Sequence, residues 1–343
     1  MTPDTHKHYL VTGAGGFIGA ALCARLQRQG HRVRALLRRP AIGPWDEAMV
    51  CDLGAEMLPP GLMDGVDGVF HLAGIAHVQD IAGIPDAVYR RVNVDATAAL
   101  LDAAVAAGVR GFVYFSSVKA VADPGERCVD EAWDAWPEDA YGRSKREAEE
   151  LVLAAGREHG LHVCNLRPCL VYGPGVKGNL ARMLDAIERG RFPPLPELGN
   201  RRSMVGLDDL LNAAQAAMDA PAAEGGTYIV SDGAPCSTRA LYLSIREALG
   251  QGVPAWTLPR WVLRAGAAAG DLMGMLLARP MPLDSSALRR LAGSACYRSE
   301  KIYRQLGWQP RQTLADALPL IIAARRRDAD AVLTPADRGR LPQ

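Results

Sequence analysis

The sequence lacks an excess of charge of either sign. Its 343 residues carry 39 lysines and arginines and 38 aspartates and glutamates, which gives a formal net charge of +1. Its arginine clusters are scattered along the chain, whereas a nucleic-acid-binding protein would gather them on one basic face. The composition therefore argues against a nucleic-acid partner.

Metal-binding and disulfide patterns are also missing. The seven cysteines include no Cys-x-x-Cys pair, and their odd number argues against a disulfide framework. We expect buried free thiols in a reducing compartment. His71 and His77 are too isolated in the sequence to predict a metal site.

No uninterrupted apolar run is long enough to span a bilayer. The most apolar stretch, residues 261–278, contains Arg264 and Asp271, whereas a membrane span needs about 20 consecutive apolar residues. Met1 is followed by polar residues rather than by an apolar signal segment. We expect helical packing of residues 261–278, no membrane insertion and a cytoplasmic location.

The sequence does contain a glycine-rich turn behind a short apolar run. Residues 9–11 are typical of a buried strand, and Gly13, Gly16 and Gly19 follow at intervals of three. Apolar residues then recur every fourth position, which indicates a helix. Gly13 would permit the tight turn, Gly16 would let a pyrophosphate approach the backbone, and Gly19 would let helix and strand pack closely. We therefore expect a dinucleotide bound at the N-terminus of this helix.

Strands and helices continue to alternate along the chain. Further strands are predicted at residues 33–37, 48–51, 68–73 and 112–115, and long helices at 85–108 and 140–160. This alternation predicts an α/β fold of the Rossmann type, a doubly wound parallel sheet whose ligands bind beyond the carboxyl ends of its strands.

The expected domains follow from the same pattern. Residues 1–167, with a returning segment at about 203–235, are predicted to form the dinucleotide-binding domain. Residues 168–202 and 236–324 are predicted to form a smaller C-terminal substrate-binding domain. The charged segment 325–343 is expected to be a flexible tail.

Three side chains are candidates for catalysis. Ser117 follows the strand at 112–115, and Tyr141 and Lys145 lie four residues apart, on one face of the next helix. Free tyrosine has a pKa of about 10, and a neighbouring ammonium lowers such a pKa. We expect Lys145 to hold a nicotinamide ribose and to lower the pKa of Tyr141. Tyr141 would exchange a proton with a substrate oxygen that Ser117 polarises.

The segment after the second strand bears on the choice of cofactor. It contains Arg38 and Arg39 and no acid. An acid there would bind the ribose 2′-hydroxyl of NAD, whereas an arginine accepts the 2′-phosphate of NADP. We therefore expect NADP(H), with NAD(H) possible. The expected cofactor-binding residues are Gly13, Gly16, Phe17, Ile18, Gly19, Arg38, Asp52, Leu53, Leu72, Ala73, Gly74, Tyr141 and Lys145.

Five segments together resemble the extended short-chain dehydrogenase/reductases, the family of nucleotide-sugar epimerases, dehydratases and ketoreductases. They are residues 12–19, 71–73, 116–117, 141–145 and 167–175. The resemblance extends from about residue 8 to Trp308. Residues 176–180 and 201–210 are similar to the bacterial UDP-sugar branch. That similarity implies that Asn179 and Arg202 hold a substrate diphosphate, and relatives imply a homodimer through the two long helices.

Departures from the family pattern narrow the activity. A sugar 4,6-dehydratase would carry an Asp-Glu pair after the catalytic hydroxyl, but Val118 and Lys119 follow Ser117. A UDP-hexose 4-epimerase usually has an acid after the second strand. The sequence most resembles NADP(H)-dependent reductases of UDP-4-keto-6-deoxy-N-acetylhexosamines, which serve surface-polysaccharide synthesis. Three alternatives stay open: a UDP-hexose or UDP-N-acetylhexosamine 4-epimerase with tightly bound NAD, a reductase of a sterol-like ketone, and a non-catalytic binding module.

Overall fold

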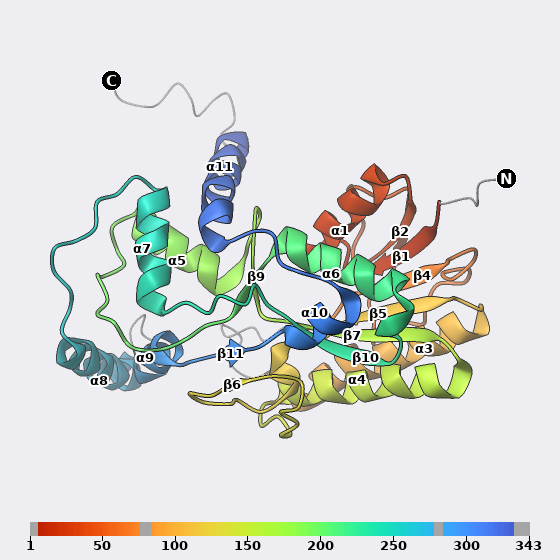
Figure 1. The fold of residues 1–343 in the computed structure, drawn as a ribbon, viewed down its shortest axis with the longest axis horizontal. Helices are drawn as coiled ribbons and strands as arrows, with labels where there is room; N and C mark the ends of the chain where they lie inside the picture. Colours follow the sequence, from red (N-terminus) through yellow and green to blue (C-terminus); the bar gives the residue numbers. More distant parts are fainter. Residues whose placement is uncertain (1–5, 76–83, 278–283, 333–343) are drawn as a thin grey trace.

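A seven-stranded sheet organises the chain. The computed structural model describes residues 6–75, 84–277 and 284–332 (Figure 1). All neighbouring strands of the sheet are parallel, in the order β10-β7-β5-β4-β1-β2-β3. The strands are β1 (His8–Thr12), β2 (Arg32–Leu37), β3 (Glu47–Val50), β4 (Gly68–His71), β5 (Gly111–Phe115), β7 (His162–Pro168) and β10 (Gly226–Val230). The chain order reverses between β1 and β4, the position at which such sheets bind ligands.

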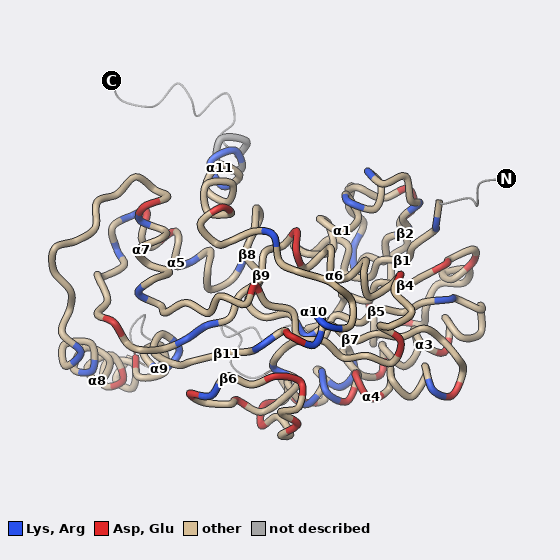
Figure 2. The backbone as a smooth tube through the Cα atoms, viewed as in Figure 1, with Lys and Arg blue, Asp and Glu red and all other residues tan. Residues whose placement is uncertain are grey.

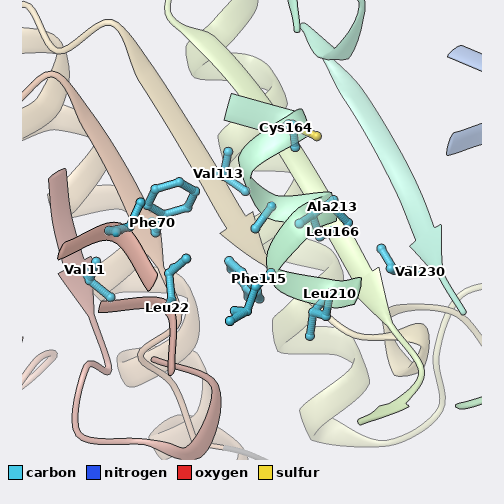
Figure 3. Packing of buried hydrophobic residues seen from close by; sticks show 14 of the residues in the cluster. Val11, Leu22, Phe70, Val113, Phe115, Cys164, Leu166, Leu210, Ala213 and Val230 are labelled. Carbon is cyan, nitrogen blue, oxygen red and sulfur yellow. The ribbon is translucent and has the colours of Figure 1, made fainter. Parts of the chain in front are cut away.

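Helices cover both faces of this sheet, which explains why its central strands are almost entirely apolar. Helices α1 (Phe17–Arg28) and α6 (Leu207–Asp219) pack on one face, and α3 (Ala96–Ala106) and α4 (Ala140–His159) on the other. Figure 3 shows Leu22 of α1 and Leu210 of α6 packed against Phe70, Val113 and Leu166 of the strands. The predicted doubly wound Rossmann fold is confirmed.

The helix predicted over residues 85–108 is present but is not a regular α-helix throughout. It consists of α2 (Asp86–Tyr89), the π-helical turn η1 (Arg90–Asp95) and α3, and Gly108 follows it with a φ of +67°. A π-helical turn shifts the side chains that follow it around the helix axis, and such turns are frequent at functional sites. Asn93 of this turn is buried.

The rest of the chain lies on one side of the sheet (Figure 1). Helices α5 (Gly178–Glu188), α7 (Thr238–Ala248) and α11 (Leu314–Val332) share an apolar core. Helices α8 (Arg260–Leu277) and α9 (Ser285–Ala292) lie farther out. The remaining elements are η2 (Val118–Ala120), β6 (Cys128–Val129), β8 (Leu170–Tyr172), β9 (Met204–Gly206), η3 (Pro221–Ala223), β11 (Cys296–Tyr297) and α10 (Glu300–Leu306).

Two expectations about this part of the chain need correction. Helix α11 continues to Val332, so the segment expected as a tail from residue 325 begins as helix, with Arg325 paired to Asp185 of α5. Residues 333–343 lie outside the described chain. The stretch at 261–278 is helical as expected through Leu277, but only a narrow stripe of α8 is buried. Within the described residues no helix is long and apolar enough to cross a membrane.

The expectation that every cysteine is a free thiol is wrong for Cys128 and Cys296, which form a disulfide. Strands β6 and β11 pair in parallel with these two residues in register, so that their Cα atoms lie 4.5 Å apart. The two cysteines are 168 positions apart in sequence, which is why spacing alone gave no signal. The other five cysteines are free.

Candidate functional site

The glycine-rich turn joins β1 to α1 at the switch point of the sheet. Gly13 has a φ of +67°, and a Cβ on it would lie 2.8 Å from the backbone nitrogen of Ala73. A Cβ on Gly19 would overlap the carbonyl oxygen of Gly13. Helix α1 begins at Phe17 with Gly16 as its N-cap. The N-terminus of α1 therefore points its free N–H groups beyond the strand ends, a cradle that fits a dinucleotide pyrophosphate.

Thr12 and His71 connect the two strands at this position. The Thr12 hydroxyl accepts hydrogen bonds from the backbone N–H groups of Leu72 and Ala73, at 3.2 and 3.0 Å, and is hydrogen-bonded to His71 Nδ1 at 2.6 Å. His71 Nε2 lies 2.9 Å from the Thr97 hydroxyl of α3. Burial lowers the pKa of His71 to about 3, so the ring is neutral and serves the packing of the strands.

Helix α4 presents Tyr141 and Lys145 toward the end of β5. It begins after Asp139, whose carboxylate accepts a hydrogen bond from Gly142 N–H at 2.8 Å. The Lys145 ammonium donates to the carbonyl oxygen of Phe115 at 2.9 Å and lies 4.7 Å from the centre of the Tyr114 ring. Burial lowers the pKa of Lys145 to about 8.

The structure brings Tyr141 and Ser117 together. The Ser117 hydroxyl lies close enough to the Tyr141 phenol to lower its pKa, and it accepts a hydrogen bond from the backbone N–H of Lys119 at 3.1 Å. Burial nevertheless raises the pKa of Tyr141 to about 12. The expectation that the Lys145 ammonium lowers the pKa of Tyr141 is therefore wrong for the protein without a bound cofactor. The loss of solvation of the phenol outweighs the interactions that would lower its pKa. Tyr141 is a protonated donor at neutral pH.

Asn93 is a site residue to which the sequence gave no role. It is buried in the π-helical turn, donates to Ser144 Oγ at 2.9 Å and exchanges hydrogen bonds with the backbone of Ile75 at 2.8 and 3.1 Å. A Cβ on Gly74 would lie 2.8 Å from Asn93 Oδ1 and 3.5 Å from Lys145 Nζ. Asn93 thus fixes the segment after β4 beside Lys145. The only local signal was a polar residue inside an apolar helical pattern.

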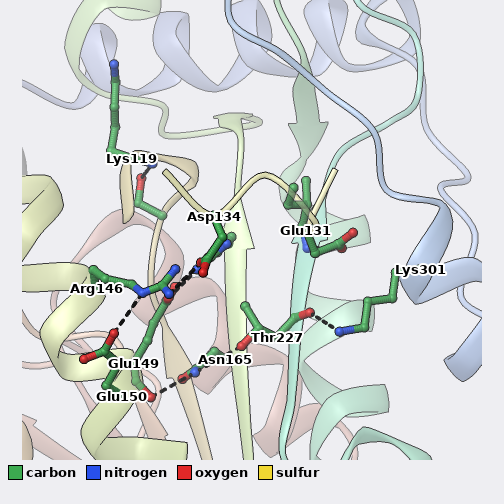
Figure 4. Close-up of polar contacts among 12 residues, drawn as sticks. Lys119, Glu131, Asp134, Arg146, Glu149, Glu150, Asn165, Thr227 and Lys301 are labelled. Carbon is green, nitrogen blue, oxygen red and sulfur yellow. Dashed lines mark hydrogen bonds and ion pairs between the residues drawn. The ribbon is translucent and has the colours of Figure 1, made fainter. Parts of the chain in front are cut away.

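The long loop after Ser117, residues 119–139, is anchored on three sides. Arg146 of α4 pairs with Asp134 at 2.6 Å (Figure 4). The Glu131 carboxylate accepts from Ile229 N–H of β10 at 2.8 Å, and the Cys128 disulfide attaches the loop to β11. A loop held in this way can maintain the position of Ser117 relative to α4.

A buried ion pair holds α4 itself against the sheet. Glu149 of α4 receives two hydrogen bonds from the Arg167 guanidinium of β7, at 2.8 and 2.6 Å, and both side chains are almost fully buried. Asn165 Nδ2 donates to the Glu149 carbonyl oxygen at 3.2 Å (Figure 4). Bidentate pairs of this kind are geometrically specific, so they fix the register of α4 on the strands.

Three other expected cofactor residues follow the second and third strands of the sheet. Arg38 is exposed directly after β2. A Cβ on Gly15 would lie 3.7 Å from the Leu37 side chain, so the end of β2 runs beside the glycine turn. Asp52 is exposed after β3, whereas the Leu53 side chain is buried in the apolar core. The Leu53 side chain thus serves packing.

The two residues expected at a substrate diphosphate lie on different elements. Asn179 is exposed in the first turn of α5 and accepts a hydrogen bond from Arg182 at 2.5 Å. Arg202 lies in the segment before β9, where its backbone pairs with Cys236 and its guanidinium donates to the carbonyl oxygen of Arg290. Its Nε is buried without a hydrogen-bond partner in the described chain. An unsatisfied buried guanidinium N–H suits an anionic ligand.

No metal centre is visible in the described part of the chain, where no three His, Cys, Asp or Glu residues gather in a ligand set. His77 lies outside the described residues. Chemically, the site combines a cradle for a dinucleotide with a protonated phenol, a serine hydroxyl and a buried ammonium. These groups suit proton exchange with an oxygen atom whose carbon undergoes hydride transfer.

The role of Gly19 in the cradle can be tested by adding one methyl group. Gly19→Ala should lower the free energy of unfolding by about 1–3 kcal/mol, because the added Cβ overlaps the Gly13 carbonyl oxygen. Urea denaturation measures this change. Gly15→Ala is the matched control, since its Cβ would make only an ordinary contact with Leu37. Equal stability of the two variants would contradict the close approach of α1 and β1.

Comparisons with known proteins agree with this geometry. The model of the NAD dependent epimerase/dehydratase family matches residues 9–231. A UDP-glucose 4-epimerase of Vibrio cholerae is 31% identical over 322 residues, which cover 90% of this chain and 93% of that protein. A 3 beta-hydroxysteroid dehydrogenase/Delta 5-->4-isomerase of Mycobacterium tuberculosis is 28% identical over 339 residues, 92% of this chain and 90% of that protein.

A solved structure extends the similarity to three dimensions. The structure described as MoeE5 in complex with UDP-glucuronic acid and NAD is 25% identical, with a TM-score of 0.73, and the match covers 94% of this chain and 99% of that chain. The family model alone spans more than half of the sequence. The chain therefore belongs to the NAD dependent epimerase/dehydratase family, in agreement with the resemblance of its motifs to the extended short-chain dehydrogenase/reductases.

Proposed function

We propose that the protein is an NADP(H)-dependent reductase that acts on the 4-keto group of a UDP-linked sugar in surface-polysaccharide synthesis. One observation carries this proposal. The buried hydroxyl of Tyr141 is protonated, lies beside the Ser117 hydroxyl, and is one helical turn from Lys145. A protonated phenol at this position is suited to donate a proton to a carbonyl oxygen during reduction.

Ser117, Tyr141 and Lys145 would each have a separate role in this reaction. A bound nicotinamide would supply the hydride to C4 of the sugar. Ser117 polarises the C4 carbonyl by hydrogen bonding, and Tyr141 transfers its proton to the developing alkoxide. Lys145 uses one N–H on the Phe115 carbonyl oxygen and retains further donors for a ribose hydroxyl.

The protonated form of Tyr141 suits the proton-donating step of a reduction. An epimerase begins by removing a proton from the C4 hydroxyl, which requires a phenolate or an equivalent base. Burial raises the pKa of Tyr141 to about 12, so the phenolate is scarce at neutral pH unless a positive charge enters the site. A reductase uses the protonated form that the protein already stabilises.

A substrate diphosphate has a candidate partner in Arg202. Its buried Nε lacks a hydrogen-bond partner among the described residues, and a guanidinium can bind two phosphate oxygens at once. The name of the Vibrio cholerae relative, UDP-glucose 4-epimerase, supports a UDP-linked substrate but not the reductase activity. By family resemblance, the proposal includes Asn179 as a second diphosphate ligand and a homodimer through α3 and α4.

A second candidate function, UDP-hexose 4-epimerase with tightly bound NAD, is favoured by that same 31% identical relative. The purified protein distinguishes the two. A reductase consumes NADPH when a UDP-4-keto-6-deoxy sugar is added, whereas an epimerase converts UDP-glucose to UDP-galactose without added cofactor. Mass spectrometry of small molecules released by denaturation should reveal no stoichiometric NAD if the reductase proposal is correct. If the protein oxidised NADPH with a steroid ketone and accepted none of the UDP-sugars tested, both candidate functions would be overturned.

Tyr141→Phe tests the proton donor. The variant should lose turnover by about 10²–10⁴-fold while the dissociation constant of NADPH stays unchanged, because only one hydroxyl is removed. Steady-state kinetics and fluorescence titration with NADPH measure the two quantities. Tyr89→Phe is the matched control, because the Tyr89 ring is also buried and its centre lies 6.3 Å from that of Tyr141. Turnover that survives in Tyr141→Phe would refute the donor role.

Arg38→Ala tests the cofactor preference. Loss of a guanidinium at a 2′-phosphate should weaken NADPH binding about tenfold, equivalent to about 1.4 kcal/mol, and leave NADH binding unchanged. Isothermal titration with both cofactors provides the comparison. Arg28→Ala removes an exposed arginine from the far end of α1 and should change neither affinity. A parallel loss for NADPH and NADH would argue against 2′-phosphate recognition.

A further inference from the structure

Helix α8 has two apolar faces, and only one of them is covered. Leu263, Ala267 and Gly270 are buried and follow helical spacing along the side that packs against α9. The opposite side carries a second apolar stripe, and its members are all exposed. They are Trp261, Ala265, Ala268, Leu272, Met275 and Leu276. A soluble helix normally has a single apolar stripe facing its core.

The exposed stripe is unusually rich in large side chains toward the end of the helix. Trp261 is 71% exposed, Met275 80%, Leu276 75% and Leu272 59%. None of the described residues covers them. Isolated exposed apolar residues are ordinary, but a contiguous exposed stripe marks a contact surface.

Arginines flank this apolar stripe. Arg260, Arg264 and Arg289 line a cleft of about 340 Å³ between α8 and α9, whose remaining wall is largely apolar and includes Leu263 and Leu288. Arg260 donates to the backbone carbonyl of Glu197 at 2.8 Å. Within the described chain neither Arg264 nor Arg289 forms a salt bridge within 4.0 Å.

The acidic groups nearby leave the cleft positive. Asp271 lies on the same side of α8 as Arg264 and accepts hydrogen bonds from the backbone and hydroxyl of Ser285, at 3.0 and 2.5 Å. The Asp284 carboxylate caps α9 by accepting from Ala287 N–H at 2.6 Å. Figure 2 shows blue segments on α8 and α9 and a red segment on α8 at this end of the molecule. Arg289 also interacts electrostatically with Asp271, so the cleft combines three guanidinium groups and one nearby carboxylate with a largely apolar wall.

We propose that α8 and α9 form a docking element for the surface of an anionic phospholipid bilayer. The exposed stripe of α8 would lie in the interface between headgroups and acyl chains, and Arg264 and Arg289 would bind lipid phosphates. An apolar stripe with an aromatic end, bordered by arginines, is the pattern of helices that lie on a membrane without crossing it. The helix therefore lies on the bilayer surface.

Charge argues against a second copy of this chain as the occupant. In a two-fold dimer the same patch faces itself, so the arginines beside one α8 would face those beside the other. Like charges brought together in this way oppose association. Anionic lipid offers phosphates to the same arginines and an apolar phase to Trp261 and Leu276.

The docking element lies away from the catalytic groups. Helices α8 and α9 are at the opposite end of the molecule from α3 and the edge of the sheet (Figure 1). Ser117, Tyr141 and Lys145 lie on β5, its following turn and α4. Lipid binding can therefore be altered without touching the catalytic residues, and the inference does not depend on the proposed reaction.

Vesicle sedimentation tests the proposal. The full chain should bind vesicles of phosphatidylcholine with phosphatidylglycerol and bind pure phosphatidylcholine much more weakly, because the arginines require anionic headgroups. The double variants Met275→Glu with Leu276→Glu, and Arg264→Glu with Arg289→Glu, should each lower the partition coefficient by roughly tenfold or more. Thermal unfolding should be nearly unchanged, since all four side chains are exposed.

Matched controls separate this site from general effects of charge. Met57→Glu changes a side chain that is 93% exposed elsewhere, and Arg304→Glu reverses an exposed arginine of α10. Both should bind vesicles like the unmodified chain. Equal binding by all variants, or no binding by the unmodified chain, would overturn the proposal. A change of molar mass in light scattering with the α8 variants would assign the surface to a second copy instead.

Discussion

The site depends on one buried contact, the hydrogen bond from the Lys145 ammonium to the carbonyl oxygen of Phe115. An ammonium is expensive to bury unless it has partners, and this one sits within an almost fully buried environment beside the Tyr114 ring. The contact links α4 to the end of β5. Because Tyr141 is one turn earlier on α4 and Ser117 is two residues after β5, the same link brings their hydroxyl groups together.

Several surrounding interactions keep that link in register. The Glu149–Arg167 pair holds the middle of α4 on β7, and Asn93 fixes Ser144 beside the segment after β4. Each is a polar group satisfied in a buried place, where an unsatisfied partner would carry a large cost. The same arrangement accounts for the neutral form of Tyr141, since it keeps the phenol away from solvent. The contacts that hold α4 on the sheet thus also keep Tyr141 buried and protonated.

The sequence predicted those features that are encoded within a few neighbouring residues. Gly13, Gly16 and Gly19 predicted the turn, and the spacing of Tyr141 and Lys145 predicted a shared helical face. The alternation of strands and helices predicted the sheet correctly because parallel crossovers follow regular rules. The sequence could not predict the pairing of Cys128 with Cys296 or of Glu131 with Ile229, because each joins distant segments. The raised pKa of Tyr141 likewise depends on burial, which local spacing does not report.

The disulfide between Cys128 and Cys296 affects what proteolytic cleavage of the chain produces. The covalent ring that it closes contains α4, β7, β10 and the helices α5 to α9. If a protease cuts one exposed bond inside this ring, the two fragments stay covalently joined. Under non-reducing electrophoresis a nicked molecule would therefore migrate as a single species, and fragmentation would become visible only after a thiol reagent is added.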